Sequence, residues 1–135
     1  MTQKFGTVAD AKELESGRIL SPKFNKDGLV TAVVTDYKSG ELLMVAHMNE
    51  TALQKTLETG QTWLWSRSRQ ALWLKGETSG SIQNVVEARL DCDQDAIWLK
   101  VERQKVEETC HTGRKSCFYR RIVTKDGDFR LESAE

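Results

Sequence analysis

The sequence predicts an α+β fold, built on a mainly antiparallel sheet with one main helix and a short N-terminal helix. Two observations predict this class. Runs of β-branched and apolar residues recur along the chain and are joined by short turns, whereas residues 50–59 have the spacing and the end signals of a longer helix. Hydrophobic residues make up 39% of the 135 residues, which suffices for one core. Residues 1–135 are therefore expected to form a single domain.

The first expected elements are a short helix and a β-hairpin. The helix is expected over Val8–Glu15, in the sequence VADAKELE. Strands are expected at residues 28–37, GLVTAVVTDY, and at residues 41–48, ELLMVAHM. The three residues KSG between them are typical of the turn of a hairpin.

The main helix is expected over residues 50–59, ETALQKTLET. Asn49 is a favourable N-cap because its side chain can accept a hydrogen bond from the first turn, and Gly60 is a favourable end. One side of this helix should face the core, and it carries Ala52, Leu53, Thr56 and Leu57.

Further strands are expected after the helix. They lie at residues 61–68, 71–76, 82–92, 96–104 and 117–124. The strand at 96–104 alternates strictly, with Ile97, Leu99 and Val101 on the face that should be buried. The last of these strands, CFYRRIVT, is expected to close the sheet, and the residues after Asp126 are expected to be peripheral.

The composition excludes several classes of protein. Twenty basic residues balance twenty acidic ones and the pI is near 6.7, which argues against a nucleic-acid or membrane-surface binder. The first residues, MTQKFGTVADAKELES, carry charges where an export signal needs an apolar run, and no stretch is long enough to span a bilayer. Three cysteines do not make a disulfide framework, so we expect reduced thiols in the cytoplasm.

The stretch DCDQD places three carboxylates, Asp91, Asp93 and Asp95, at alternating positions. Such like charges raise one another's pKa unless a cation offsets them. In an extended segment the three would share one face and Cys92 would point the other way, and oxygen ligands suit magnesium. A solvated strand end stays open as an alternative. An EF-hand loop is excluded, because Ala96 stands where its sharp turn needs glycine.

The three thiols suggest a catalytic zinc site, which takes three protein ligands and leaves one position for water. Cys110 and Cys117 flank HTGRKS, whereas Cys92 precedes the strand at 96–104 and should lie at its other end. The simplest shared site therefore takes Cys92 from one subunit and the other two cysteines from its partner in a two-fold dimer. Buried apolar cysteine is the plain alternative, above all for Cys117.

Taken together, the motifs WSRSRQALWLKGETSG, ARLDCDQDA and CHTGRKSCFYR closely resemble phosphoribosyl-AMP cyclohydrolase of histidine biosynthesis. DYKSGELLMVAHMNETALQKTLETG fits the N-terminal half of that family, so that the resemblance runs from about Val30 to Arg120. It implies a monofunctional enzyme that hydrolyses the N1–C6 bond of the adenine ring in 1-(5-phosphoribosyl)-AMP. The product would be the phosphoribosyl-formimino imidazole carboxamide ribotide.

The resemblance also implies an intertwined homodimer with zinc and magnesium as cofactors. The zinc ligands match Cys92, Cys110 and Cys117, and the magnesium ligands match Asp91, Asp93 and Asp95. The family's zinc sites are shared between subunits. His47 stands where the family often has an aromatic residue and is expected to be structural, and RQKVEETCH before the second cysteine is more charged than usual.

The remaining site residues are expected to move protons and hold phosphate. Zinc lowers the pKa of bound water from about 15.7 toward 7. His111 is the candidate proton shuttle, although it could instead only support the cysteine loop. Arg67 and Arg69, on one face of a strand, and the KGETSG loop are the candidate phosphate sites. The substrate-binding set is Ser66, Arg67, Ser68, Arg69, Lys75, Gly76, Thr78, Ser79 and Gly80.

Two other functions stay open from the sequence. A non-catalytic, zinc-stabilised binding module would need a fourth protein ligand, which His111 could supply. A generic phosphate-binding protein would not need the thiols. The tryptophans at 63, 65 and 73 are expected to belong mainly to the core, with at most one of them stacking on the purine.

Overall fold

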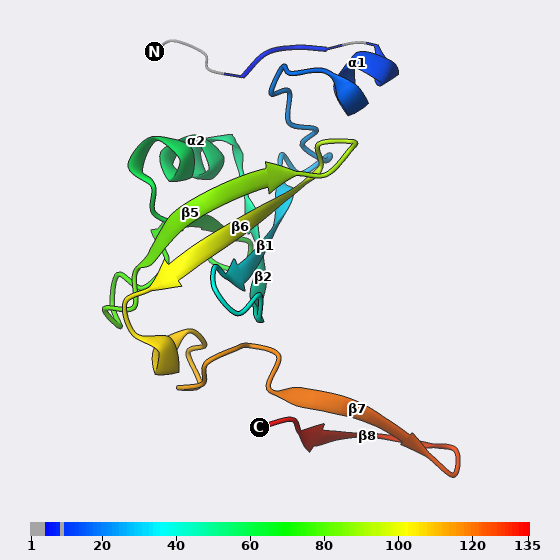
Figure 1. Cartoon of the computed structure of the whole chain (residues 1–135), viewed down its shortest axis with the longest axis vertical. Helices are drawn as coiled ribbons and strands as arrows, with labels where there is room; N and C mark the ends of the chain where they lie inside the picture. Colours follow the sequence, from blue (N-terminus) through cyan, green and yellow to red (C-terminus); the bar gives the residue numbers. More distant parts are fainter. Residues whose placement is uncertain (1–4, 9) are drawn as a thin grey trace.

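The computed structural model describes residues 5–8 and 10–135. Its helices and mainly antiparallel strands form an α+β fold (Figure 1). The helices are α1 (Ala11–Ser16), α2 (Glu50–Thr59) and the 3₁₀ turn η1 (Val106–Glu108). The strands are β1 (Val30–Asp36), β2 (Leu42–Met48), β3 (Trp63–Ser66), β4 (Ala71–Leu74), β5 (Gln83–Leu90), β6 (Ala96–Arg103), β7 (Arg120–Lys125) and β8 (Asp128–Ser133). None of the described helices is long and apolar enough to cross a membrane.

The short N-terminal helix starts later than the sequence predicts. Asp10 is the N-cap of α1, and its side chain accepts a hydrogen bond from the backbone N–H of Lys12. An aspartate at this position competes for the first-turn amides and so fixes the start of the helix. Val8, placed in the expected helix, is outside it, and Ala9 lies outside the described residues.

The hairpin β1–β2 and helix α2 form where the sequence predicts them. Asn49 accepts a hydrogen bond from Ala52 N–H, and Gly60 ends α2 with a left-handed φ of 74°. Leu53 is fully buried in the core, whereas Leu57, expected on the same side, is 42% exposed. The hydroxyl of Thr56 accepts a hydrogen bond from Trp63 N–H, so α2 is attached directly to β3.

The main sheet has the order β2–β1–β6–β5. The outer pairs are antiparallel, as predicted, but β1 and β6 run parallel, with Thr31 opposite Ala96 and Asp36 opposite Val101. The predicted alternation of β6 is confirmed, because Ile97, Leu99 and Val101 are all buried.

The C-terminal strand does not close this sheet, contrary to the sequence-based expectation. Within the part of the chain that the structure describes, β7 pairs with β8 alone, in a separate two-stranded hairpin. Asp126 and Gly127 form its two-residue turn, and both have positive φ, 52° and 80°. An Asp-Gly pair of this kind is a strong local hairpin signal, and local pairing with β8 therefore prevails over pairing with the sheet.

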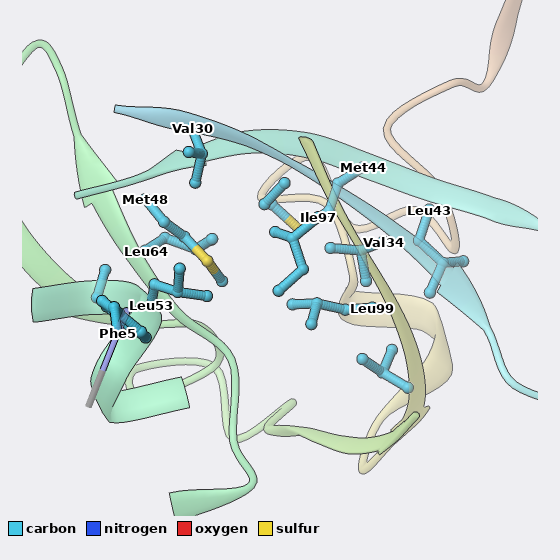
Figure 2. Packing of buried hydrophobic residues seen from close by; sticks show 13 residues of the cluster. Phe5, Val30, Val34, Leu43, Met44, Met48, Leu53, Leu64, Ile97 and Leu99 are labelled. Atoms are coloured by element: carbon cyan, nitrogen blue, oxygen red, sulfur yellow. The ribbon is translucent and has the colours of Figure 1, made fainter. Parts of the chain in front are cut away.

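The core lies between one face of the main sheet and a layer made of α2 and β3. Figure 2 shows side chains from these elements pointing toward one another, among them Val34, Leu53, Leu64 and Leu99, all fully buried. The opposite face of the sheet carries more exposed side chains, among them Val45 at 45% and Trp98 at 36% exposure.

Candidate functional site

A cavity of about 440 Å³ collects several of the predicted site residues. Three stretches of the chain meet there: the end of the β3–β4 turn, the loop after β4 and the loop after η1. The predicted residues among its lining are Arg69, Lys75, Gly76, Thr78, Ser79, Cys110 and His111. The cavity therefore places cationic side chains, hydroxyls, a thiol and an imidazole around one space.

The loop from Lys75 to Gly80 needs glycine for its shape. Gly76 has a φ of 88°, and a Cβ there would lie 2.1 Å from the carbonyl oxygen of Ser81. Gly80 has a φ of 83° and donates its N–H to the carbonyl of Gly76 at 2.8 Å. The hydroxyl of Ser81 donates to the carbonyl of Lys105, which fastens the loop to the end of β6.

Lys75 is the buried cation of this cavity, with only 9% of the residue exposed. Burial lowers the pKa of its amine, while the nearby thiols of Cys117 and Cys110 act in the opposite direction. The amine lies 5.8 Å from the centre of the Trp73 ring. An anion bound in the cavity would favour the charged form of this buried amine.

Cys110 and Cys117 lie beside one another in a tightly folded loop. Cys117 donates its N–H to the carbonyl of Leu43, and Ser116 donates its hydroxyl to the carbonyl of Leu42, so the loop is fixed to the start of β2. Thr112 donates its hydroxyl to the Sγ of Cys110 at 3.1 Å. These contacts hold the thiols in place independently of any ligand.

The pKa values of the two thiols are shifted in opposite directions. Burial, together with its hydrogen bond to Cys110, raises the pKa of Cys117 to about 11. Partial burial also disfavours the thiolate of Cys110, but the hydroxyl and N–H of Thr112, the thiol of Cys117 and the charge of Lys75 outweigh it and lower its pKa. The loop thus places two soft sulfur donors side by side, and a cation bound between them would take the place of their protons.

Arg103, the last residue of β6, ties this loop to the sheet. Its side chain is 4% exposed and pairs with Asp36 at 3.1 Å. Its other terminal nitrogen donates to the hydroxyl of Thr109 at 2.9 Å and to the carbonyl of Lys115 at 2.7 Å. A guanidinium suits this place because its donors point in fixed, divergent directions. Sequence reasoning missed Arg103, because no pattern distinguishes it from a strand-end arginine.

The acidic group lies in the turn between β5 and β6 and is not extended, contrary to the expectation. Gln94 has a φ of 59° there, and Asp91 accepts hydrogen bonds from the backbone N–H groups of Asp95 and Ala96. The turn nevertheless gathers the carboxylates, since one oxygen each of Asp91, Asp93 and Asp95 lies within 4.8 Å of the others.

The closeness of these carboxylates shifts their pKa values, because like charges repel one another. The hydrogen bond with Asp93, then that with Asp91, raises the pKa of Asp95 to about 6. Burial opposes ionisation of Asp91, but the N–H of Ala96 and its carboxyl neighbours lower its pKa. The group fits a divalent cation, because three carboxylate oxygens already converge and repel one another.

Cys92 lies in this same turn and is exposed, far from the other two thiols. Cys110 and Cys117 follow the opposite end of β6, which spans eight residues or roughly 26 Å at 3.3 Å per residue. Figure 1 shows the β5–β6 turn and η1 at opposite ends of these strands. Within the described residues, one chain brings the three aspartates together but not the three cysteines.

The arginines of the SRSR motif occupy a turn and not a strand, which corrects the expected shared face. Residues 67–70 form the β3–β4 turn, with Gln70 at a φ of 50°. Arg69 lines the cavity near Cys110, whereas Arg67 lines a second cavity of about 320 Å³ with Trp65 and Asn49. The reversal of the chain within four residues sends the two side chains to different places.

The other predicted residues take supporting positions. Ser66 accepts a hydrogen bond from the N–H of Arg69 at 3.2 Å, and its hydroxyl lies 3.4 Å from that of Ser68, so both serines shape the turn. His47 is half-buried, and burial, then the charge of Arg67, lowers its pKa. Trp73 lines the first cavity, with Arg69 5.8 Å from its ring centre.

Comparison with known proteins identifies relatives along most of the chain. A sequence model of the phosphoribosyl-AMP cyclohydrolase family matches residues 44–119. Phosphoribosyl-AMP cyclohydrolase of Brucella anthropi is 61% identical over 123 residues, 91% of this chain and 87% of that protein. The enzyme of Brucella abortus is 59% identical over 126 residues, 93% and 91% respectively. That of Mesorhizobium japonicum is 61% identical over 121 residues, 90% and 79% respectively.

Proposed function

The chain belongs to the phosphoribosyl-AMP cyclohydrolase family, enzymes of histidine biosynthesis, and from this premise we propose a zinc-dependent hydrolysis of the N1–C6 bond of phosphoribosyl-AMP. The observation that carries the proposal is the cavity of about 440 Å³, where Cys110 and His111 face the loop that begins at Lys75. Thiol donors, a proton carrier and a phosphate cradle surround one space large enough for part of a nucleotide.

The substrate's phosphate is assigned to the loop after β4. Lys75 supplies a buried cation, Gly76 gives the loop its shape, and Thr78 and Ser79 supply hydroxyls. The Trp73 ring at the same cavity offers a flat apolar surface for the purine. Arg69 reaches this space from the β3–β4 turn, and Ser66 holds it there.

Cys110 and Cys117, with a third thiol from Cys92, are the donors for zinc. Soft sulfur ligands suit this metal, and three of them leave one position open for catalysis. Zinc supplies Lewis acidity, which brings the pKa of a water molecule toward neutrality. Lys75 next to the thiols favours their ionised form, as a metal site requires.

The proton is moved by His111, which lies next to Cys110 and lines the same cavity. Its imidazole accepts a proton from the attacking water while the oxygen adds to C6 of the purine. The tetrahedral carbon then collapses, the C6–N1 bond breaks, and the imidazolium returns the proton to N1. C6 becomes a carboxamide: the water oxygen is its carbonyl oxygen, one water proton is on N1, and the other goes to the exocyclic imino nitrogen of C6, which becomes the amide NH2. Imidazole suits both transfers because its ordinary pKa lies near 6.5.

Magnesium is assigned to Asp91, Asp93 and Asp95. A cavity of about 310 Å³ beside Asp93 and Asp95 also receives Lys23. It adjoins the cavity of Arg67 through Leu29, which lines both. The second phosphate of the substrate is assigned to this half, where the cation and basic side chains meet.

The active enzyme is proposed to be a homodimer in which the two halves come from different subunits. Cys92 of one subunit would join Cys110 and Cys117 of the other, because one chain keeps them at opposite ends of β6. Free thiols of this kind are kept reduced in a cytoplasm, where we place the enzyme.

The test is turnover of phosphoribosyl-AMP by mixed variants. Cys92→Ala and Cys110→Ala should each be inactive. When they are dissociated and mixed, half of the dimers are mixed and each of these keeps one complete site. The mixture should therefore regain about a quarter of the wild-type turnover, as two-fold symmetry requires.

A matched control shows whether the regained turnover comes from a zinc site shared between subunits. Cys110→Ala mixed with Cys117→Ala should regain nothing, because both changes lie in the same half of the site. Zinc retained at full stoichiometry by Cys92→Ala would reject the shared site. Turnover that survives complete chelation of the wild type would reject the role of zinc itself.

A further inference from the structure

Gln94 stands in the middle of the acidic turn between β5 and β6 and is buried, although both of its neighbours are exposed. Its exposed fraction is only 7%, whereas Asp93 and Asp95 are exposed. Its backbone has a φ of 59°, in the left-handed region that favours glycine and that other residues adopt at a cost. A buried glutamine held in such a conformation, next to two candidate metal ligands, indicates a role for its side chain.

The side chain of Gln94 is bound to a distant part of the chain, residues 14–23, which we call the clasp. Its amide nitrogen donates to the carbonyl of Leu14 at 2.9 Å and to that of Ile19 at 3.2 Å. Its amide oxygen accepts a hydrogen bond from the buried N–H of Ser21 at 2.7 Å. Its backbone carbonyl accepts one from the N–H of Lys23, also at 2.7 Å. A single residue of the turn therefore holds both ends and the middle of the clasp.

The clasp is in turn anchored on the body of the protein. Leu20 within it and Phe24 directly after it pack against the hydrophobic core. The carbonyl of Leu20 also accepts a hydrogen bond from the N–H of Gly6 at 2.8 Å. Figure 1 shows α1 and the residues after it beyond the end of the sheet where the β5–β6 turn lies. Gln94 thus connects the acidic turn to a segment that the core holds in place.

This connection fixes the part of the turn that carries the outer carboxylates. Asp93 and Asp95 are the direct neighbours of Gln94, and one oxygen of each lies within 4.8 Å of the other and of Asp91. The N–H of Gln94 also donates to the carbonyl of Asp91 at 3.1 Å. Carboxylates that outer hydrogen bonds hold in position lose less freedom when a cation binds, and they bind it more tightly for that reason.

The clasp also contributes to the surroundings of the carboxylates. Lys23 lines the cavity of about 310 Å³ together with Asp93 and Asp95. The backbone of Lys23 is the part of the clasp that hydrogen-bonds the Gln94 carbonyl. Release of the clasp would therefore loosen the turn and, at the same time, remove one wall of its cavity.

We propose that Gln94 is a positioning residue for the cation of the acidic turn, and that it acts by tying this turn to the clasp. The proposal rests on the assignment of magnesium to Asp91, Asp93 and Asp95 made above. It implies that clasp and cation stabilise one another. A closed clasp strengthens cation binding, and a bound cation must keep the clasp closed by the same factor, because such coupling is reciprocal.

The first test is the affinity of the full, zinc-loaded protein for magnesium chloride, measured by titration calorimetry. Gln94→Gly removes the side-chain hydrogen bonds and relieves the backbone, because glycine favours a positive φ. Gln94→Met removes the same hydrogen bonds and keeps most of the side-chain volume. Both variants should bind magnesium about 10- to 100-fold more weakly, the usual effect of losing a group that orients a metal ligand.

Asp126→Gly is the matched control for the change to glycine. Asp126 has a φ of 52° in the β7–β8 turn, so the substitution makes the same backbone change away from the clasp. It should leave the magnesium affinity as it is in the wild type.

The second test measures the reverse effect, that of magnesium on the clasp. Trypsin cleaves after Arg18, an exposed residue directly before Ile19, and the clasp must open locally before the protease can act. Saturating magnesium should slow this cleavage in the wild type by about the same 10- to 100-fold. In Gln94→Gly the cleavage should be fast with or without magnesium. Mass spectrometry of the fragments identifies the bond that is cut.

Three results would overturn the positioning role: equal magnesium affinity in the wild type and both Gln94 variants, an equal loss in Asp126→Gly, or wild-type cleavage that magnesium does not slow. The cleavage of the wild type needs no variant, so it decides the matter even if both substitutions at Gln94 prevent folding. A wild type that binds no magnesium overturns the magnesium assignment together with the role of Gln94. Zinc-dependent turnover of phosphoribosyl-AMP judges the proposed hydrolysis separately in every case.

Discussion

Replacement of Arg103 by methionine should loosen the cysteine loop from the sheet. The guanidinium pairs with Asp36 and donates to Thr109 and to the carbonyl of Lys115 from an almost fully buried position. Methionine has a similar length and apolar stem but none of these donors. The variant therefore removes the connections and keeps most of the packing.

The expected loss follows from the burial of the pair. Removing one partner of a buried ion pair costs about 3–5 kcal/mol, because the other charge stays uncompensated. The side chain of Asp36 is 16% exposed and keeps two backbone donors, Lys38 and Ser39, so the lower end applies. We expect a loss of about 3 kcal/mol of unfolding free energy, which lowers the melting temperature by roughly 10 °C for a domain of this size.

The assay is urea unfolding together with zinc affinity. Arg130→Met is the matched control, since Arg130 pairs with Glu132 at 3.5 Å with more than half of its side chain exposed, and such pairs contribute about 0–1 kcal/mol. Arg103→Met should also bind zinc more weakly, because its ligand loop has lost its support. A loss of stability no larger than in the control would refute the buried clamp, and unchanged zinc affinity would refute its positioning role.

The remaining predictions concern pH and packing. The pKa of Asp36 is lowered in the folded chain by the N–H groups of Ser39 and Lys38 and by the charge of Arg103. Ionised Asp36 therefore stabilises the fold above the ordinary pKa of 3.8, and this stabilisation is lost as pH falls below that value. The free energy of unfolding, measured against pH, should show this loss in the wild type but less of it in Arg103→Met. Gly76→Ala should distort the loop at residues 75–80, because its Cβ would clash with the backbone of Ser81, and should lower the turnover of phosphoribosyl-AMP. Gly113→Ala, with positive φ but open space, should cost about 1–2 kcal/mol in urea unfolding. Leu53→Ala should cost about 2–5 kcal/mol by the same measurement, because it leaves a cavity in the core.

Helix caps and strand alternation predicted the elements whose limits depend on residues nearby in the sequence. Asn49 and Gly60 fixed both ends of α2, and the alternation from Ile97 to Val101 identified the buried face of β6. The motifs named residues of the loop at Lys75 and of the cysteine loop, and these line one cavity although they lie on different parts of the chain. Capping and alternation depend on neighbours within a few residues, and for that reason they can be read from the chain directly.

Other features depend on which distant segments meet, and these escaped prediction. Nothing near Thr31 indicates that β1 pairs in parallel with β6. Arg103 gained its role only when β6 ended beside Asp36 and the cysteine loop. Arg67 and Ser68, the first half of the turn at 67–70, were predicted as the end of a strand because serine and arginine are compatible with either structure. The β7–β8 hairpin was also not predicted, although the Asp126–Gly127 pair is a local signal that identifies its turn.

The parallel pairing of β1 with β6 also determines how the chain must fold. β1 and β2 can form their hairpin early, but the neighbour of β1 on its other side is made only after residues 37–95. During synthesis the apolar face of that hairpin therefore waits for β6, and loop closure must precede any gain from the central pairing. Folding should consequently be slow for a chain of this length, with the incomplete sheet as the species most exposed to aggregation and to chaperone binding.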